Sequence, residues 1–155
     1  MKMQLPLINH IVLADDDRDH AILFKSILRK VDPSKALIHV KNGAELMDLL
    51  SVTQPEILFL DLKMPCKNGH ECLEEIRQNP EFRNLRIVVY SSSVEMNNIK
   101  KCYYNKADLY IVKPFTSEHL INALASILKK ELQKDLFRNY HYFINNKFVP
   151  FTALA

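Results

Sequence analysis

Five short apolar runs recur along the chain, with almost no polar residues inside them. Runs rich in Ile, Val and Leu without polar alternation are typical of strands buried on both faces of a parallel sheet. We therefore predict five short strands, which cover residues 11–14, 37–40, 57–60, 87–90 and 109–112.

Helical patterns lie between and after these runs. In the first, apolar residues recur on one face from Ala21 to Val31. Asn42 is a suitable N-cap for the second helix, and Ser92-x-x-Glu95 has the spacing of a capping box at the start of the fourth. The predicted helices begin near residues 18, 43, 70, 92 and 117, and the last continues to about residue 132.

The predicted order is strand then helix, five times over. Right-handed crossovers then place helices on both faces of a parallel sheet. The fold class is α/β, a doubly wound (βα)5 five-stranded sheet. Ligands of such sheets bind at the carboxyl ends of the strands, beside the topological switch point. The residues directly after each strand are therefore the candidates for function.

Composition narrows the function classes. The 155 residues suit one core, and 48% apolar with 25% charged residues is ordinary for a soluble domain. Only Gly43 and Gly69 are glycines, which excludes a Gly-rich phosphate loop, and a net charge of +3 does not indicate nucleic acid. The three cysteines form no Cys-x-x-Cys pair, so we expect free thiols in a reducing cytoplasm. No apolar run is long enough for a signal peptide or a membrane span.

Acidic, hydroxyl and basic residues follow four of the predicted strands. In chain order they are Asp15, Asp16, Asp61, Ser91 and Lys113. Carboxylates gathered in a partly desolvated site repel one another, and a hard divalent cation such as Mg²⁺ relieves that repulsion. The lysine can pair with Asp61 or with a phosphate. This set suits transfer of a phosphoryl group to the Asp61 carboxylate.

The motifs at these strand ends resemble those of the response regulator receiver domains. The segment 11–16 resembles the family's first strand and acidic pair, and the segment 58–65, followed by Gly69, resembles its phosphoacceptor motif. The resemblance covers roughly Leu7 to Leu132 and implies the flavodoxin-like strand order 2-1-3-4-5.

Two intervals strengthen the resemblance. Ser91 lies thirty residues after Asp61 and twenty-two before Lys113, as do the family's hydroxyl and lysine. Tyr110 stands three residues before Lys113, at the position of the family's aromatic switch residue. The resemblance therefore implies that Ser91 and Tyr110 change together on phosphorylation.

The resemblance also implies a metal site. In that reading Asp16 and Asp61 bind Mg²⁺ directly, Lys63 contributes its backbone carbonyl, and Asp15 acts through water. The bond between Lys113 and Pro114 is expected to be cis.

One departure from the family's pattern affects a turn. Lys106 stands where the family usually has glycine. Asn105 is the residue we expect to adopt the left-handed conformation there, since Asn tolerates it.

The implied function is that of a single-domain response regulator in a two-component phosphorelay. It would accept the phosphoryl group on Asp61 from a histidine kinase or histidine phosphotransfer protein, and pass a signal to a downstream protein. It would be no enzyme beyond its own phosphorylation and dephosphorylation, with no direct nucleic-acid or membrane partner and a cytoplasmic location.

Three alternatives differ in their sequence requirements. A phosphohydrolase with an aspartate nucleophile would carry a second Asp two residues later, where this chain has Lys63. A flavin or nucleotide binder would need a loop rich in Gly, Ser or Thr after the first strand, which here is acidic. A phosphorylation-independent interaction module would usually lose an acid or the lysine.

Several residues near the site have simpler interpretations. Asp17 is expected to cap the first helix, and Ser92 or Ser93 the fourth. His70 is interpreted as a solvated residue at the start of the third helix. Cys66 is interpreted as an inert thiol.

The C-terminal segment is aromatic and carries a turn signal. We assign residues 7–136 to the receiver domain and residues 137–155 to a tail too short for an output domain. Two aromatic runs flank Asn145-Asn146, which resembles a hairpin whose second run, with Pro150, suits an edge position. The tail either packs on its own domain or forms a homodimer contact.

Overall fold

The predicted alternation of strands and helices is present in the computed structural model, which describes residues 5–129, 136–137 and 140–151. The strands are β1 (Leu5–Ala14), β2 (Ala36–Val40), β3 (Thr53–Leu60), β4 (Arg86–Ser91), β5 (Leu109–Val112), β6 (His141–Ile144) and β7 (Lys147–Pro150). The helices are α1 (Arg18–Val31), α2 (Gly43–Leu50), α3 (Gly69–Gln78), the 3-10 helix η1 (Pro80–Phe82), α4 (Met96–Tyr104) and α5 (Ser117–Leu128). The expected end of the fifth helix near residue 132 lies outside the described residues. Among the helices described, none combines the length and apolarity needed to cross a membrane.

The strands form one sheet in the order β2-β1-β3-β4-β5-β6-β7. Every neighbouring pair is parallel except β6 and β7, which are antiparallel. The predicted core order 2-1-3-4-5 is therefore confirmed. The C-terminal segment adds two strands that continue the sheet beyond β5.

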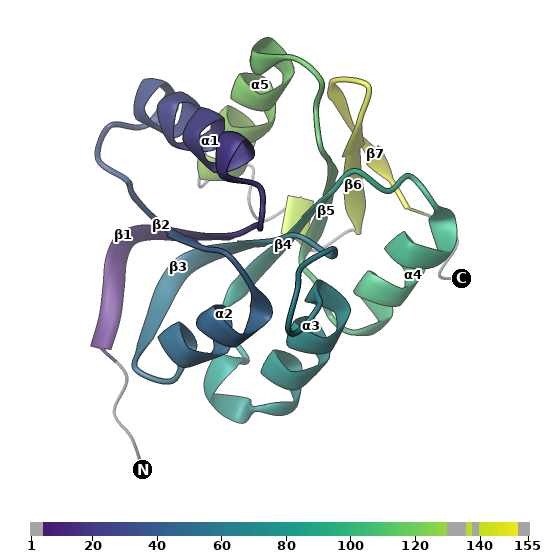
Figure 1. Cartoon of the computed structure of the whole chain (residues 1–155). Coiled ribbons are helices and arrows are strands. Elements are labelled where there is room, and N and C mark those ends of the chain that lie inside the picture. Colours follow the sequence, from purple (N-terminus) through teal and green to yellow (C-terminus); the bar gives the residue numbers. More distant parts are fainter. Residues whose placement is uncertain (1–4, 130–135, 138–139, 152–155) are drawn as a thin grey trace.

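Helices cover both faces of the sheet (Figure 1). α1 and α5 lie together on one face, whereas α2, α3 and α4 cover the other. Consecutive residues of a strand point to opposite faces of the sheet. In β1, Leu13 packs in the core beside α1 and Val12 in the core beside α2 and α3. In β3, Phe59 and Leu58 divide between the two cores in the same way. Phe24 of α1 contacts Phe59 with ring centroids 5.0 Å apart. This burial on both faces explains why the strands lack polar alternation.

Two strands begin earlier than predicted. β1 starts at Leu5 rather than Ile11, and β3 starts at Thr53 rather than Ile57. The pairing register between them shifts in the added stretch, where Asn9 has a left-handed φ of 64°. Such a bulge interrupts the regular period of side chains, so the pattern did not reveal the extra residues.

Polar caps fix the starts of four helices, α5 among them, where the Thr116 hydroxyl accepts from the His119 N–H at 3.2 Å. The side chain of Asp17 accepts hydrogen bonds from backbone N–H groups in the first turn of α1, as predicted, and Asn42 does the same for α2. At α3, Asn68 and Glu71 form a reciprocal capping box. These caps place each helix start at the carboxyl end of the preceding strand.

The predicted start of α4 is wrong. The helix begins at Met96, and Glu95 at the N-cap makes no side-chain cap hydrogen bond. The hydroxyl of Ser93 instead accepts hydrogen bonds from the Glu95 backbone N–H at 3.3 Å and from the Asn98 amide at 2.9 Å. These local bonds stabilise a loop in place of a helical turn, so Ser92 and Ser93 remain outside the helix.

The end of α4 also differs from the expectation. Lys106 has the left-handed φ of 68°, whereas Asn105 has φ −86°. The backbone N–H groups of Lys106 and Ala107 donate to the carbonyls of Tyr103 and Cys102 respectively, which is the Schellman pattern. That pattern fixes which position is left-handed, and it overrides the preference of Asn for the conformation.

The C-terminal segment forms the expected hairpin. Asn145 and Asn146 have φ values of 51° and 63°, both left-handed, as a type I′ turn requires. β6 pairs with β5, and Tyr142 lies opposite Tyr110 in the ladder. β7 is the outer strand and ends at Pro150, in agreement with the predicted edge position.

Side-chain contacts hold this hairpin against the helices on either side of β5. The Tyr103 ring of α4 packs on Phe151 with centroids 5.5 Å apart, and its hydroxyl donates to the His141 carbonyl. On the other side, the Asn122 amide of α5 donates to Asn146 at 3.0 Å. The hairpin therefore contacts α4, β5 and α5 within the same chain.

Candidate functional site

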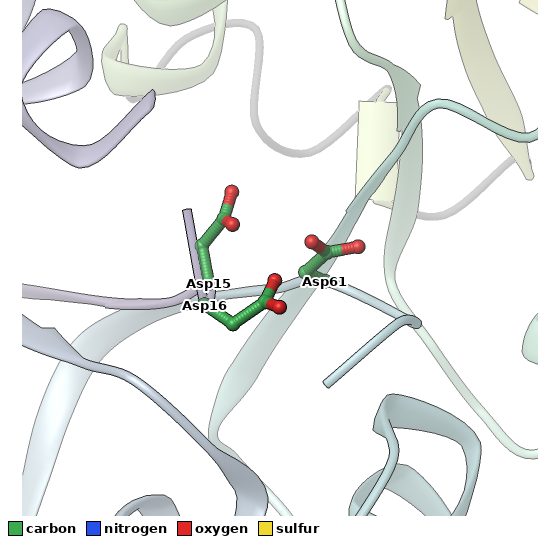
Figure 2. Close-up of side chains that lie close together, drawn as sticks. All are labelled: Asp15, Asp16 and Asp61. Carbon is green, nitrogen blue, oxygen red and sulfur yellow. The ribbon is translucent and has the colours of Figure 1, made fainter. Parts of the chain in front are cut away.

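Three carboxylates meet at the carboxyl edge of the sheet (Figure 2). Asp15 and Asp16 directly follow β1, and Asp61 follows the neighbouring strand β3. One oxygen from each carboxylate lies within 4.8 Å of those of the other two. Asp15 is fully buried, Asp61 is 5% exposed and Asp16 is exposed. The structure thus brings together the acids that the sequence places at two strand ends.

Backbone hydrogen bonds hold two of these carboxylates in place. The Asp61 N–H donates to the Ala14 carbonyl at 2.9 Å, which extends the β1–β3 ladder past the strand end. Asp15 Oδ1 accepts from the Asp17 N–H at 2.9 Å, and Asp61 Oδ1 accepts from the Lys63 N–H at 3.2 Å. One oxygen of each carboxylate is therefore already bonded within the loops, and the other faces the site.

Lys113 bridges the two buried acids. Its Nζ lies 2.8 Å from Asp15 Oδ2 and 3.0 Å from Asp61 Oδ2. Its backbone N–H donates to the Ser91 carbonyl at 2.9 Å, which fixes the end of β5 against β4. The ammonium also lies 5.3 Å from the centre of the Tyr90 ring, where a cation is attracted to the aromatic face.

The charges in this site depend on one another. Burial raises the pKa of Asp61, the charge of Lys113 acts against that rise, and the charge of Asp15 adds to it. Burial also disfavours the charge on Lys113, but its contacts with Asp15 and Asp61 leave its pKa above the usual value. The Asp61 carboxylate is therefore poorly solvated, and its charge is stabilised chiefly by the lysine.

The donor set fits a hard divalent cation. Asp15, Asp16 and Asp61 offer three negative charges against the single ammonium of Lys113, so the cluster has excess negative charge. All of the ligand atoms that converge there are carboxylate oxygens, which suit ions such as Mg²⁺ and Mn²⁺.

Ser91 and Tyr110 are connected through Ser93. Ser91 is 2% exposed, and its hydroxyl accepts a hydrogen bond from the Ser93 N–H at 3.2 Å. The Tyr110 hydroxyl donates to the Ser93 carbonyl at 2.8 Å. Burial raises the pKa of Tyr110 to about 12, so the phenol keeps its proton and remains a donor at neutral pH. One peptide segment therefore joins the two residues that the resemblance to receiver domains predicts to change together.

Two histidines near the acids were missed from the sequence. His20 of α1 places Nδ1 3.2 Å from Lys113 Nζ. His39 of β2 places Nε2 2.7 Å from the backbone carbonyl of Asp15. The position of His20, one turn after the acids, is a signal that could have identified it. His39 gave no such signal, because its contact depends on the pairing of β1 with β2.

Gly69 is required by a close approach of the backbone. A Cβ atom at this position would lie 2.1 Å from the carbonyl oxygen of Asp61. The Gly69 N–H donates to the Leu62 carbonyl at 3.0 Å, which folds the start of α3 back against the end of β3. This contact explains the spacing of eight residues between Asp61 and the glycine.

Two expectations near the site are wrong. The described part of the chain contains no cis peptide bond, so Lys113 and Pro114 are joined by a trans bond. The trans isomer is the more stable one before proline by about 0.5–1 kcal/mol.

His70 is half-buried rather than solvated, with Nδ1 4.0 Å from the Cys102 sulfur, and burial lowers its pKa.

The amino-acid sequence is similar to those of known proteins. A match to the family described as response regulator receiver domain spans residues 11–125. The response regulator Rcp1 of Synechocystis sp. is 26% identical over 124 residues, which cover 76% of this chain and 84% of Rcp1. The transcriptional regulatory protein CpxR of Escherichia coli is 30% identical over 122 residues, which cover 79% of this chain and 50% of CpxR.

Solved structures share the fold. The Mn²⁺-bound form of Rcp1 has a TM-score of 0.70 at 25% identity, and the match covers 79% of this chain and 94% of that one. The response regulator RPA3017, described in red light signaling of R. palustris, has a TM-score of 0.71 at 22% identity, with 96% and 100% covered. The family match extends over most of the sequence. The chain therefore belongs to the response regulator receiver domain family.

Proposed function

We propose that this receiver domain is a phosphorylation-controlled switch in which Asp61 accepts a phosphoryl group from a histidine kinase or a histidine phosphotransfer protein. The observation that carries the proposal is the Lys113 ammonium, 3.0 Å from Asp61 and 2.8 Å from Asp15, beside the carboxylate cluster. A fixed positive charge next to a poorly solvated carboxylate suits a nucleophile that takes up a phosphoryl group.

Mg²⁺ is the cation we propose for the carboxylate cluster. Asp16 and Asp61 would hold it directly, together with the backbone carbonyl of Lys63. Asp15 would act through water, which agrees with its burial and its direct bond to Lys113. When bound, the ion neutralises charge on the oxygens of the phosphoryl group. The Mn²⁺-bound form of Rcp1 supports a divalent ion in this family.

Asp61, Lys113 and Ser91 have different roles in the phosphoryl transfer. An oxygen of Asp61 forms a bond to phosphorus while the bond between phosphorus and the donor's histidine nitrogen breaks, and that nitrogen keeps the electron pair. Asp61 reacts as a carboxylate, so it releases no proton. Lys113 exchanges its contact with Asp61 Oδ2 for one with a phosphoryl oxygen. Ser91 donates its hydroxyl to another of those oxygens.

The switch follows from the connection through Ser93. When the Ser91 hydroxyl turns toward the phosphoryl group, the Ser93 N–H loses its acceptor at 3.2 Å. The loop that Tyr110 holds through the Ser93 carbonyl is then free to move, and the Tyr110 ring can occupy the space that opens. This movement changes the surface formed by α4, β5 and α5. The added charge on Asp61 thus shifts the loop and the Tyr110 ring between two arrangements.

The surroundings of the site support a protein as phosphodonor. A groove of about 520 Å³, lined in part by Leu23, Val94 and Phe115, adjoins the Asp61 cleft, since His20 and Lys113 line both. Leu23 and Val94 are 43% and 54% exposed, and Phe115 is fully exposed. Exposed apolar residues around a polar site are typical of a surface that binds another protein. The partners we propose are cytoplasmic.

One experiment tests the proposal. The protein is incubated with acetyl phosphate and Mg²⁺, and intact-protein mass spectrometry measures the phosphoryl adduct. We expect one adduct that maps to Asp61, that is absent from Asp61→Asn, and that is suppressed when EDTA removes the cation. An adduct of equal yield on Asp61→Asn would overturn the assignment of Asp61. A folded wild type that gains no adduct would favour a phosphorylation-independent interaction module.

A further inference from the structure

The ammonium of Lys113 makes three polar contacts, and it has three N–H donors. Two of the acceptors are the carboxylates of Asp15 and Asp61, at 2.8 and 3.0 Å. The third is Nδ1 of His20, at 3.2 Å. Lys113 thus has an acceptor for every donor, and one of the three is an imidazole outside the carboxylate cluster.

The Lys113 ammonium can only donate, so Nδ1 of His20 is the acceptor in this contact. Nε2 lies 3.5 Å from the Asp17 carboxylate, at the outer limit of hydrogen-bond distance. Asp17 is itself held as the N-cap of α1 by the Asp19 and His20 backbone N–H groups. The ring thus contacts Asp17 through Nε2 and Lys113 through Nδ1.

The imidazole differs from the other two acceptors in its chemistry. A divalent cation draws electron density from the carboxylates that it contacts, and an incoming phosphoryl group engages Asp61. His20 contributes no ligand atom to the acidic cluster, although its Nδ1 lies 3.7 Å from Asp15 Oδ2, so its contact with Lys113 uses none of the carboxylate oxygens. A flexible lysine side chain needs such a fixed acceptor to stay in position while the others change partners.

We propose that His20 is a positioning residue for phosphoryl transfer, which holds the Lys113 ammonium beside Asp61 through its Nδ1. This inference rests on the proposed function of Asp61. Loss of the imidazole leaves the third donor to water, and the ammonium then spends less time beside the phosphoryl oxygens.

The test compares three variants. His20→Ala removes the acceptor, and His20→Gln supplies an amide oxygen that can accept in its place. His119→Ala is the matched control, because His119 occupies the same third position of α5, where Thr116 caps its backbone N–H as Asp17 caps that of His20. His20 is exposed and His119 is half-buried, so none of the three variants removes a fully buried side chain.

The first measurement needs no phosphodonor. Nitrogen-15 NMR detects lysine ammonium groups whose protons are held by acceptors, and Lys113→Arg identifies the Lys113 signal by its loss. We expect His20→Ala to shift or broaden this signal, and His20→Gln and His119→Ala to retain it. An unchanged Lys113 signal in His20→Ala overturns the inference, even if Asp61 proves to be the phosphoacceptor.

The second measurement is the rate of phosphorylation by acetyl phosphate with Mg²⁺. Loss of one hydrogen bond predicts a rate about 3- to 10-fold lower for His20→Ala, with recovery in His20→Gln and no change in His119→Ala. A wild-type rate in His20→Ala contradicts the inference. If even the wild type gains no phosphoryl group, the proposed function fails, and the NMR signal alone decides whether His20 positions Lys113.

Discussion

The Tyr110 hydroxyl donates a 2.8 Å hydrogen bond to the Ser93 carbonyl, from the centre of β5 to the loop after β4. Tyr110 is fully buried, so water cannot easily replace its hydroxyl. Tyr110→Phe should therefore lower the free energy of unfolding by roughly 1 kcal/mol, measured by urea denaturation.

The matched control for this change is Tyr104→Phe. Tyr104 is 80% exposed, and the same atom is removed from its side chain. We expect a change within about 0.5 kcal/mol for this variant. Equal losses in the two variants would show that the Tyr110 hydroxyl does not hold the β4–α4 loop.

Lys106 offers a stabilising substitution. Its φ of 68° disfavours any residue with a Cβ, and the backbone bonds of the Schellman motif do not involve its side chain. Lys106→Gly should raise the free energy of unfolding by about 1 kcal/mol. Asn105→Gly is the control and should lower it, because Asn105 has φ −86° and gains no relief of strain. The reverse ranking in denaturant would place the left-handed residue at position 105.

The three cysteines should differ in reactivity. Cys66 is exposed, whereas Cys72 and Cys102 are buried. Burial raises the pKa of Cys72 to about 11 and that of Cys102 to about 12, so both remain thiols at neutral pH. Iodoacetamide at pH 8 should modify Cys66 alone in the folded protein, and all three after unfolding in urea, as peptide mass spectrometry can measure. Rapid modification of Cys72 in the folded state would contradict the packing of α3.

Truncation after Leu136 removes both strands of the hairpin. Phe143 and Phe151 are 2% and 6% exposed, and loss of two buried aromatic side chains should lower the free energy of unfolding by at least about 2 kcal/mol. We expect the number of chains per particle in light scattering not to fall, because the hairpin packs within its own chain. A dimer that becomes a monomer on truncation would instead assign the hairpin to a homodimer contact.

The sequence revealed the features that depend on local pattern or on strand ends. The uninterrupted apolar run at residues 57–60 identified β3, and the position of Asp61 directly after it placed that carboxylate in the site. The cap at Asp17 was predictable because Asp bonds to backbone N–H groups within the next turn.

Two kinds of feature could not be predicted: those in which alternative hydrogen bonds compete, and those that depend on residues distant in the sequence. Ser92-x-x-Glu95 had the spacing of a capping box, but the Ser93 hydroxyl accepts hydrogen bonds from Glu95 and Asn98 instead. The hairpin was predictable from Asn145-Asn146, yet its pairing with β5 was not, because any free edge could have received it. The contact of His20 with Lys113 joins residues 93 positions apart.

The hairpin also determines which strand lies at the edge of the sheet beyond β5. Without it, the apolar strand Leu109–Val112 would present unpaired N–H and C=O groups to strands of other chains. With it, the outermost of the described strands is β7, which is four residues long, begins at Lys147 and ends at Pro150. A short edge that carries lysine and proline is a poor template for intermolecular pairing. We therefore expect the hairpin to disfavour edge-to-edge association at this side of the sheet.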